Sequence, residues 1–440
     1  MTVRTRFAPS PTGQVHIGNI RAAIYNWLFA RHEGGQFLLR IEDTGRARST
    51  PAAVQAVLDA LTWLGLNWDE TPLYQSTRTA AHLAAAEQLL QAGHAYKEDK
   101  GGTGKGECVI FRMPGTEMSF HDEIKGHLAK QAADMKDFVI VRSDGTPVFH
   151  LANVVDDIHM QITHIIRGDD HVENTYRHVA LFRALGATPP KYAHLPMIVN
   201  AQGKPYSKRD GAAYVGDFRD KGYLPEALFN FLALLGWSPG GDRELMTRAE
   251  LVQLFSFARV LSSPAQMDLV KLLWMNGEYM RALPRDQREA ACRAVLQARG
   301  LWNETLPPDY LGRVLDVMAE RVKLFTDIAD AGYFFIEDFS FDEKTVQKRL
   351  KKEGAVELLA AARTAYAALA DFSATTTEAA LRELATARGL GLGDFVHPVR
   401  VAVSGTGVGP SLFHMLEVLG KDRVLRRIDK TLAKFGGTQK

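Results

Sequence analysis

The beginning of the chain constrains the fold most strongly, because strand and helix signals alternate there over short distances. Val3, Thr5 and Phe7 alternate with arginines in residues 3–7, which predicts a short strand ending at the Pro/Ser/Gly-rich turn 9–13. Apolar side chains recur at helical spacing in residues 20–28, and residues 37–41 form a second apolar run of strand length. A strand, helix and strand with short connections form a right-handed βαβ unit, so we expect a parallel sheet whose ligand binds beyond the carboxyl ends of the strands.

The rest of the chain divides into further regions by pattern. Between residues 74 and 153, an Ala/Leu-rich segment, a Gly/Lys loop and several strand-like runs predict a module inserted into the sheet. Strand signals return at residues 162–166 and 196–199, with a helix over 177–185 between them. From residue 223 onward nearly every segment has helical periodicity. The pattern therefore predicts a split α/β domain, an inserted module and a helical C-terminal half.

The composition is that of a globular protein with few cysteines. Of 440 residues, 46% are hydrophobic and 24% are charged, with 53 Lys and Arg against 51 Asp and Glu; these fractions exclude disordered and collagen-like classes. Cys108 and Cys292 are too few for a disulfide framework or, by themselves, for a thiolate zinc site. No apolar run reaches the roughly 18 residues of a membrane span, and the N-terminus lacks a signal-peptide pattern, so we predict a cytoplasmic protein.

Residues 8–19 (APSPTGQVHIGN) contain the first motif suited to a ligand. They connect the first predicted strand to the first predicted helix, where free N–H groups and the helix dipole favour an anion. Gly18 allows a ligand to approach the backbone closely, and His16 can donate a hydrogen bond to a phosphate oxygen. A lone histidine at a helix start is more often a cap than a catalytic group, but its place in this βα turn favours the functional interpretation.

Residues 203–211 (GKPYSKRDG) form the second motif. Three cationic side chains in a glycine-flanked loop, after the last apparent strand, suit a mobile clamp on a polyphosphate. Lys208 would supply positive charge where negative charge develops during chemistry at phosphorus. Such a string alone is more often a solvated basic loop, but the two motifs together are far more specific than either.

Nine segments of the chain resemble the corresponding segments of bacterial glutamyl-tRNA synthetases, which are class I aminoacyl-tRNA synthetases. They are FAPSPTGQVHIGN, LLRIEDT, TWLGLNWDE, YQS, FHLANVVDD, THIIRGDDHVENT, HLPMIVN, YSKRDG and GYLPEALFNFLALLGWSP. Residues 16–19 resemble the H-I-G-H element of the class, and residues 205–209 resemble its K-M-S-K-S element in the K-L-S-K-R form. The similarity covers residues 4–240 without a large gap and resumes in later segments, so it extends over nearly the whole chain.

The resemblance implies a two-step reaction. ATP, with Mg²⁺, and L-glutamate would give glutamyl-adenylate and pyrophosphate, and the 3′-terminal adenosine of tRNA(Glu) would then take the glutamyl group. Matching positions assign ATP binding to His16, Gly18, Asn19, Ser207, Lys208 and Arg209, with His16 and Lys208 as the catalytic residues. They assign glutamate binding to Arg6, Ser10, Glu42, Phe149, Asn153 and Arg167. Arg6 would pair with the side-chain carboxylate of the substrate, and Ser10 and Glu42 would hold its amino group.

The resemblance also implies the fold: an α/β Rossmann-like class I synthetase catalytic domain with an inserted α+β module, followed by an all-α C-terminal half. We expect the catalytic domain in residues 1–75 and 154–200 and the acceptor-stem-binding module in residues 76–153. A helical stem-contact domain carrying the YSKRD loop would follow in residues 201–285, and the helical anticodon-binding domain in residues 286–440. We expect a monomer without membrane contact.

Several positions depart from the family pattern. Pro205 replaces the first lysine of K-L-S-K-R, which is displaced to Lys204, and Gly45 replaces the second aspartate of I-E-D-T-D. Phe149 stands where a tyrosine commonly contacts the substrate, and a missing donor can weaken discrimination between glutamate and glutamine. Residues 101–106 lack both a thiolate pair and the P-loop spacing, so we expect no structural zinc and interpret them as a surface loop.

The helical half carries two basic clusters of the kind that binds a phosphate backbone, although exposed helices also carry such residues for solubility. They are Lys344, Lys348, Arg349, Lys351 and Lys352, and then Lys421, Arg423, Arg426, Arg427, Lys430 and Lys434. Ala319 falls near a family position that helps to decide between tRNAs for glutamate and glutamine. Its small side chain offers no hydrogen bond, so a second-copy or non-discriminating form that also charges tRNA(Gln) stays open.

Structural alternatives remain for single residues: Arg6 and Arg40 as strand-end surface charges, Glu42 and Asp43 as a helix-dipole or salt-bridge pair, and Asn153, Asp156 and Asp157 as turn residues. Rival functions also remain. A glutaminyl-tRNA synthetase would have β-barrel anticodon domains, a glutamyl-queuosine enzyme would lack the anticodon half, and a nucleotidyltransferase would not explain the helical half. Pro205 and Gly45 motivate a fourth rival, a paralogue that binds tRNA without catalysis.

Overall fold

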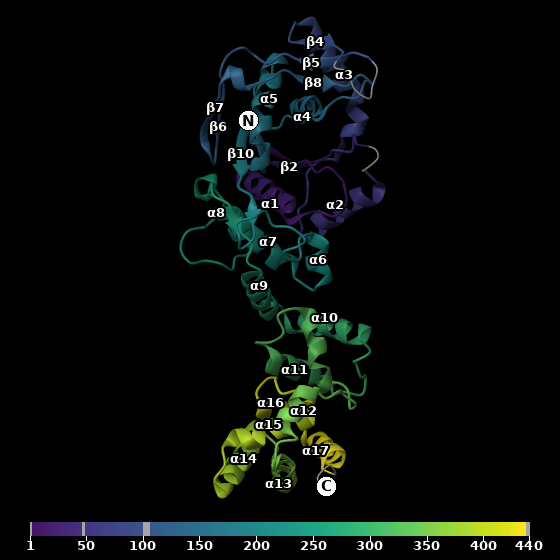
Figure 1. The fold of residues 1–440 in the computed structure, drawn as a ribbon, viewed down its shortest axis with the longest axis vertical. Coiled ribbons are helices and arrows are strands. Elements are labelled where there is room, and N and C mark those ends of the chain that lie inside the picture. Colours follow the sequence, from purple (N-terminus) through teal and green to yellow (C-terminus); the bar gives the residue numbers. More distant parts are fainter. Residues whose placement is uncertain (1, 46–48, 100–105, 437–440) are drawn as a thin grey trace. The chain divides into compact units, whose positions relative to one another are not determined.

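The structure is a computed structural model that describes residues 2–45, 49–99 and 106–436 (Figure 1). The chain forms two compact units, residues 1–275 and residues 276–440, which are described separately below.

The predicted βαβ unit opens the first unit. Strand β1 (Arg4–Phe7) pairs in parallel with β2 (Gln36–Ile41), and β2 pairs in parallel with β3 (Leu73–Tyr74). Helix α1 (Ile17–His32) connects β1 to β2, and its residues Ile20, Ala23, Ile24 and Leu28 are fully buried. The helix is longer than the sequence pattern indicated, because His16 caps it directly after the turn. Helix α2 (Pro51–Trp63) follows β2 with Thr50 as its cap.

A second group of strands continues beside the first. Its order is β7 (Gly126–Lys130), β6 (Met118–Asp122), β10 (Lys191–Leu195) and β9 (His164–Gly168), with β10 parallel to both neighbours. Strand β1 lies next to β9, since the Thr163 N–H donates to the Arg4 carbonyl. The sequence pattern predicted a strand over 196–199 and did not predict β10, because Lys191 and His194 interrupt the apolar run. Only β11 (Ile198–Val199) lies in that range.

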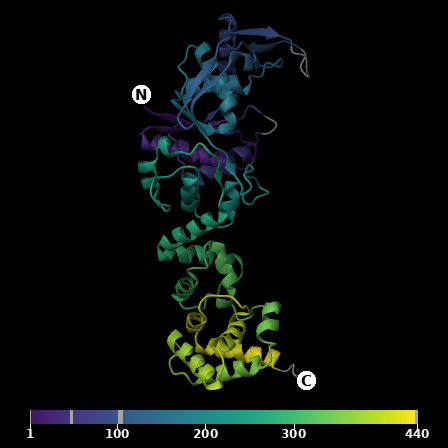
Figure 2. The same cartoon turned by 60° about the vertical axis from the view of Figure 1, so that its left-hand side comes forward.

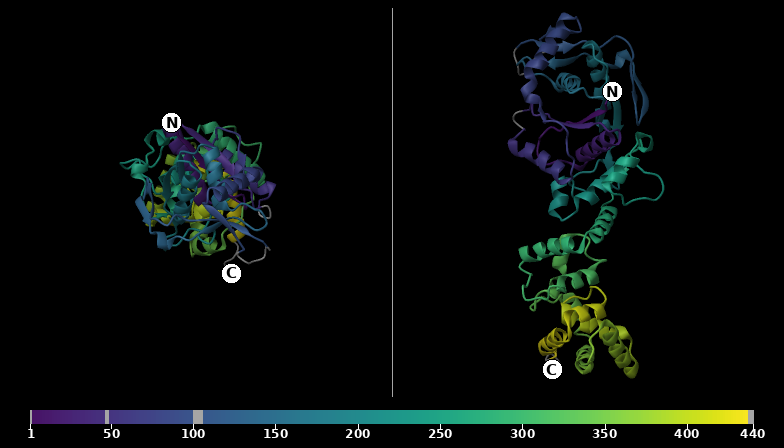
Figure 3. Two further views of the ribbon diagram at one scale, coloured as in Figure 1. Left: turned by 90° about the horizontal axis from the view of Figure 1, so that it is seen from above. Right: turned by 180° about the vertical axis from the view of Figure 1, so that it is seen from behind.

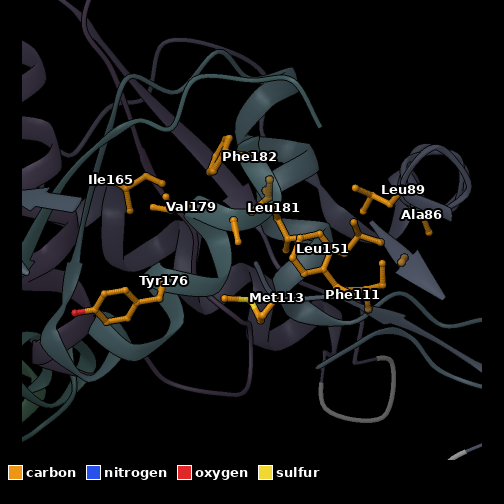
Figure 4. Close-up of a cluster of buried hydrophobic side chains, with 14 of the residues drawn as sticks. Ala86, Leu89, Phe111, Met113, Leu151, Ile165, Tyr176, Val179, Leu181 and Phe182 are labelled. Carbon is orange, nitrogen blue, oxygen red and sulfur yellow. The ribbon is translucent and has the colours of Figure 1, made fainter. Parts of the chain in front are cut away.

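The inserted segment contributes a small antiparallel sheet and a helix. The sheet has the order β4 (Ala95–Glu98), β5 (Cys108–Phe111) and β8 (Phe138–Val141), and α3 (Thr79–Gln91) precedes it. Figure 4 shows its core continuing into the rest of the unit, with Leu89 and Phe111 beside Leu151 of α4 (Phe149–His159) and Leu181 of α5 (Val172–Ala184). One apolar core therefore joins the insertion to the helices that follow it.

The remaining elements are mainly helices. The first unit continues through α6 (Val215–Asp220), α7 (Pro225–Leu234), α8 (Arg248–Leu254), β12 (Ala265–Gln266), which pairs with β11, and α9 (Leu269–Ala282), which runs on into the second unit. The second unit contains α10 (Arg285–Ala298), α11 (Tyr310–Met318), α12 (Glu343–Arg349), α13 (Ala355–Ala368), α14 (Ala374–Arg388), α15 (Leu392–Ser404), α16 (Leu412–Leu419) and α17 (Lys421–Phe435). Figures 2 and 3 show this part, in green to yellow, as helices and loops. The predicted split α/β domain with a helical C-terminal half is confirmed.

Candidate active site

A cavity of about 470 Å³ lies in the first unit, at the carboxyl ends of the parallel strands. The βαβ pattern predicts a ligand site at this edge of the sheet. Nine of the twelve predicted site residues line it: Arg6, Ser10, His16, Gly18, Asn19, Glu42, Phe149, Asn153 and Arg167. The three others, Ser207, Lys208 and Arg209, lie in the loop that follows Pro205 and Tyr206, which do line it.

Five strands of the unit carry a buried polar side chain at their last or next-to-last residue. These residues are Arg6 on β1, Arg40 on β2, Arg167 on β9, His194 on β10 and Asp122 on β6. Parallel strands place their carboxyl ends along one edge, and here that edge gathers charged and polar groups from segments far apart in the sequence.

Arg6, Arg40 and Arg167 form a buried charge cluster with Glu42 and Asp157. Asp157 Oδ1 accepts from Arg6 Nε at 3.1 Å and from Arg40 Nη1 at 2.5 Å. Arg40 Nη2 also donates to Glu42 Oε1 at 3.3 Å. Arg6 is 4% exposed and Arg40 is fully buried, so the alternative that they are surface charges is wrong.

The polar residues around this cluster also lie within regular structure. Asn153 accepts a hydrogen bond from Arg40 through its side-chain oxygen, and its amide donates to the Phe149 carbonyl. Asn153 and Asp157 belong to helix α4, so the interpretation of this segment as a turn is wrong. Asp43 instead accepts from the backbone N–H and the hydroxyl of Ser76, at the start of the next short helical turn.

The ionisation of the cluster follows from its burial and its charges. Burial opposes the charged form of Asp157, but the nearby Arg40 and Arg6 outweigh it and lower its pKa. Burial raises the pKa of Glu42 despite the opposing charges of Arg40 and Arg6. Burial also lowers the pKa of Arg167 to about 10, still well above neutral pH.

The charge cluster lacks one negative charge. Three arginines against two carboxylates leave a net charge of +1 when all five groups are ionised. Arg167 forms no ion pair among the described residues, since its guanidinium donates to the Thr175 hydroxyl, the His171 carbonyl and the His194 ring. A buried and uncompensated guanidinium beside a cavity is suited to a carboxylate, which it can bind in a bidentate manner. This part of the cavity therefore fits an anionic ligand.

His16 caps helix α1 and faces the cavity. Its Nδ1 accepts a hydrogen bond from the Gly18 N–H at 3.1 Å. Burial lowers its pKa, although a hydrogen bond with the Tyr206 backbone opposes the shift. The ring is therefore neutral near pH 7, and it links the first motif to the start of the second.

The second motif is fixed at its base, while its cationic side chains are exposed. The Ser207 N–H and hydroxyl donate to Asp210 Oδ2, and Asn200 donates to Asp210 Oδ1 at 2.7 Å. Lys208 Nζ lies 5.8 Å from the centre of the Tyr214 ring, which meets the His16 ring edge-on. The two motifs thus lie side by side, but Lys208 and Arg209 do not line the cavity.

Sequence reasoning missed three buried residues of the site. Arg40 has the same next-to-last place in its strand as Arg6, and this repetition was the available signal. Asp157 lies in a segment already used for the resemblance. Arg21 of α1, which lines the cavity, donates to the carbonyls of Pro196 and Leu235, and no local pattern indicates those partners.

The basic residues of the second unit divide into two groups. Arg427 is 2% exposed, and with Arg423 it donates to backbone carbonyls of residues 333–336 and 403, so these two do not form a phosphate-binding surface. Lys344, Lys348 and Lys351 are exposed on and after α12. Near them, the charges of Arg349 and Arg400 contribute to the lowered pKa of His397, after burial.

Membrane spans and metal clusters are both absent from the described part of the chain. Residues 2–45, 49–99 and 106–436 contain no helix that could cross a membrane. In the same ranges no group of three or more His, Cys, Asp or Glu side chains is arranged to hold a metal ion. Of the loop 101–106, only the last residue is described.

Family models match both parts of the chain. The model for class I tRNA synthetases (E and Q), catalytic domain, matches residues 2–103 and 98–274. The model for an anticodon binding domain matches residues 286–432. This second match, together with helices throughout the described part of the second unit, is inconsistent with an enzyme that lacks an anticodon half or carries one made of β-barrels.

Curated relatives and solved structures match over the full length. Glutamate–tRNA ligase 1 of Caldanaerobacter subterraneus subsp. tengcongensis is 39% identical, over 98% of this chain and 97% of its own. Glutamate–tRNA ligase of Xanthomonas campestris pv. campestris is 42% identical, over 99% of this chain and 100% of its own. The crystal structure of a glutamate tRNA ligase from Elizabethkingia meningosepticum, in complex with its amino acid, superposes with a TM-score of 0.86 at 30% identity, covering 99% and 100% of the two chains. The chain therefore belongs to the glutamate–tRNA ligase family of class I tRNA synthetases.

Proposed function

We propose that this glutamate–tRNA ligase binds and activates glutamate in the cavity beside the buried charge cluster. The observation that carries the proposal is the net charge of +1 among Arg6, Arg40, Glu42, Asp157 and Arg167. Glutamate has two carboxylates and one ammonium group, a net charge of −1, and would neutralise the cluster. The membership of the chain in its family supports the same substrate.

The predicted roles fit the geometry. Arg6 uses only its Nε in the bond to Asp157, which leaves its outer nitrogens for the side-chain carboxylate of the substrate. Arg167, without an ion-pair partner among the described residues, would hold a carboxylate with it. Glu42 and Ser10 line the same cavity and would accept from the ammonium group. Phe149 supplies an aromatic wall without a hydroxyl group.

ATP would bind beside the glutamate site, at the start of helix α1. Asn19 presents a backbone N–H group of the first helical turn beside Gly18, and the neutral His16 ring would donate to a phosphate oxygen in place of the Tyr206 backbone. The loop with Ser207, Lys208 and Arg209 would close over the triphosphate, with Mg²⁺ accompanying the nucleotide. Lys208 would then oppose negative charge that develops at the α-phosphorus, an interaction stronger in the transition state than in the ground state.

The activated glutamyl group would pass to the 3′ end of tRNA(Glu). We propose that the segment 76–153 binds the acceptor stem, 201–285 contacts the stem, and 286–440 reads the anticodon. The exposed lysines of α12 support the last assignment. Ala319 is the C-cap of helix α11, and its carbonyl accepts from Arg281. Its methyl side chain has no donor or acceptor for an anticodon base. Charging of tRNA(Gln) is therefore part of the proposal, and no glutamate transfer to that isoacceptor would contradict it.

Glutamate-dependent exchange of pyrophosphate into ATP tests the central claim. We expect exchange only when tRNA is present, and silence with every tRNA tested would favour the binding-only rival. Lys208→Ala should lower the exchange rate about 100-fold and leave tRNA affinity nearly unchanged, because the loop acts on charge at phosphorus. Arg219→Ala is the matched control, since Arg219 is an exposed cation on α6 that lies outside the cavity. A collapse of tRNA affinity in Lys208→Ala would refute the assignment of the loop.

A further inference from the structure

Arg167 is held by a chain of buried polar groups that ends in the inserted segment. Asp122, the last residue of β6, lies with its Oδ2 2.6 Å from Nδ1 of His194 on β10. His194 Nε2 lies 2.9 Å from the Thr175 hydroxyl and 3.4 Å from Arg167 Nε. Thr175 also accepts from Arg167 Nη2 at 2.7 Å. Asp122, His194 and Thr175 are all fully buried, and none lines the cavity.

The hydrogen bonds of Asp122 determine where the protons lie on His194 and Thr175. The two turn amides of Ile124 and Lys125 donate to Asp122 Oδ1, and the backbone N–H of His194 donates to both carboxylate oxygens. The carboxylate is therefore ionised and only accepts. His194 must then donate from Nδ1, so in the neutral ring Nε2 is an acceptor.

Arg167 needs a hydrogen-bond acceptor at His194 Nε2 for its Nε–H group. The Arg167 Nε–H points to that lone pair, and Arg167 Nη2–H points to the Thr175 oxygen, whose own proton can go to His194 or to the His171 carbonyl at 3.1 Å. With the other tautomer, a proton on Nε2 would face the N–H groups of the guanidinium. Thr175 could still accept from Arg167 Nη2 while it donates to the His171 carbonyl, but the Arg167 Nε–H would lose its acceptor and face a second donor, so the guanidinium would shift.

We propose that Asp122, His194 and Thr175 are positioning residues for glutamate: Asp122 fixes the tautomer of His194, and His194 and Thr175 hold the Arg167 guanidinium against the cavity. The inference rests on the proposed role of Arg167 in binding glutamate. Its consequence is that a residue in the inserted segment sets the geometry of the amino-acid pocket, although it touches no substrate.

Asp122→Asn is the direct test, because the two side chains have the same shape. The Asn amide would donate to Nδ1 and force the proton of His194 onto Nε2. We expect the KM for glutamate to rise about tenfold, with kcat and the KM for ATP changed less than about threefold. Nitrogen-15 shifts of the His194 ring should change from the Nδ1–H to the Nε2–H tautomer. An unchanged KM for glutamate, or an equal rise for ATP, would overturn the proposal.

A matched control separates positioning from folding. Asp156→Asn makes the same substitution in another buried Asp–His pair, in which Asp156 binds His82, Gln75 and Arg78. None of these residues lines the cavity, so we expect the KM for glutamate to stay within about twofold of the wild-type value. A tenfold rise in this variant as well would show that the effect of Asp122→Asn is a general loss of structure.

A second pair of variants keeps the proposal testable if Asp122→Asn does not fold. Thr175→Val should raise the KM for glutamate about tenfold, because it removes the acceptor of the 2.7 Å hydrogen bond from Arg167 Nη2. Thr175→Ser keeps the hydroxyl and should restore the value, and equal behaviour of the two would contradict the proposal. Arg167→Gln tests the premise separately: if it leaves the KM for glutamate unchanged, the proposed function of Arg167 fails, whatever Asp122→Asn does.

Discussion

Single residues at this site combine burial with charge in a way that sequence patterns do not report. Arg40 and Arg6 lie in short apolar strands, where a charged residue next to the strand end has the appearance of a surface group. The structure instead buries both and joins Arg6 to Asp157, 151 positions later in the chain. The resemblance predicted roles for Arg6, Glu42 and Arg167, because these residues lie in family motifs. It did not identify Arg40 or Asp122, because their partners are defined only in three dimensions.

Arg40 is the residue whose loss should cost the most stability. Arg40→Met leaves Asp157 with a single partner and Glu42 with none of its present ion pairs, so the free energy of unfolding should fall by about 3–5 kcal/mol. Urea unfolding of both proteins measures this difference in the free energy of unfolding. Arg31→Gln is the control, since Arg31 pairs with Asp69 near the surface and its loss should cost less than about 1 kcal/mol. Equal losses in the two variants would contradict the central place given to Arg40.

Glu42 should make the stability of the protein depend on pH. Because its pKa is raised in the folded state, its contribution is complete below the unfolded pKa of about 4.3 and is lost as the pH rises through the folded pKa. The stability of Glu42→Gln relative to wild type should therefore increase from pH 4 toward pH 7, as measured by thermal unfolding. The same variant should raise the KM for glutamate, because the proposed partner of the ammonium group has lost its charge. A stability difference that falls with pH would show the opposite shift.

At the scale of elements, the regular pattern was predictable and the exceptions have identifiable causes. Helices α1 and α10 and strand β2 follow from periodicity, since each buries an apolar face or run. Strand β10 does not, because its interior His194 is polar and its partners Asp122 and Thr175 lie on other elements. The segment 149–159 contains enough polar residues to suggest a turn, yet their partners on β1 and β2 stabilise it as helix α4.

The cap of helix α1 allows the structural and the chemical role of His16 to be separated. His16→Ala removes the acceptor for the Gly18 N–H and should cost about 1 kcal/mol of stability, whereas His16→Asn keeps a good cap. Both variants remove the ring that would face the phosphates, so both should exchange pyrophosphate about 100-fold more slowly. Unfolding curves and pyrophosphate-exchange rates measured on the same samples separate the two roles. A wild-type rate of pyrophosphate exchange in His16→Asn would show that His16 acts only as a helix cap.

At the scale of the whole molecule, the two units divide the chemistry. The first unit gathers the strand ends into one cavity, and the second is a set of helices matched by an anticodon-binding model. The order of these parts along the chain was predictable from composition and resemblance. The division of the basic residues was not, because internal arginines such as Arg427 and exposed lysines such as Lys348 have the same appearance in a sequence.

That division predicts which basic residues bind tRNA. Replacing Lys344, Lys348 and Lys351 together with Gln should weaken tRNA binding and reduce the slope of log affinity against log salt by about 0.7–0.9 for each phosphate that is no longer neutralised. Filter binding at several salt concentrations measures it. Lys430→Gln, which removes a partner of Asp338, should change the slope little. An unaltered slope in the triple variant would exclude this surface from the RNA interface.

Backbone hydrogen bonds hold both ends of the loop that carries Lys208, and this bears on how easily the loop could close. On one side the Tyr206 N–H donates to the Ile198 carbonyl. On the other, the Ile17 N–H donates to the Ala213 carbonyl and the Val215 N–H donates to the Val15 carbonyl. A segment with fixed endpoints has few conformations to lose when it orders around a nucleotide. The closure proposed above would then need little binding energy, and reopening to release pyrophosphate would meet no large barrier.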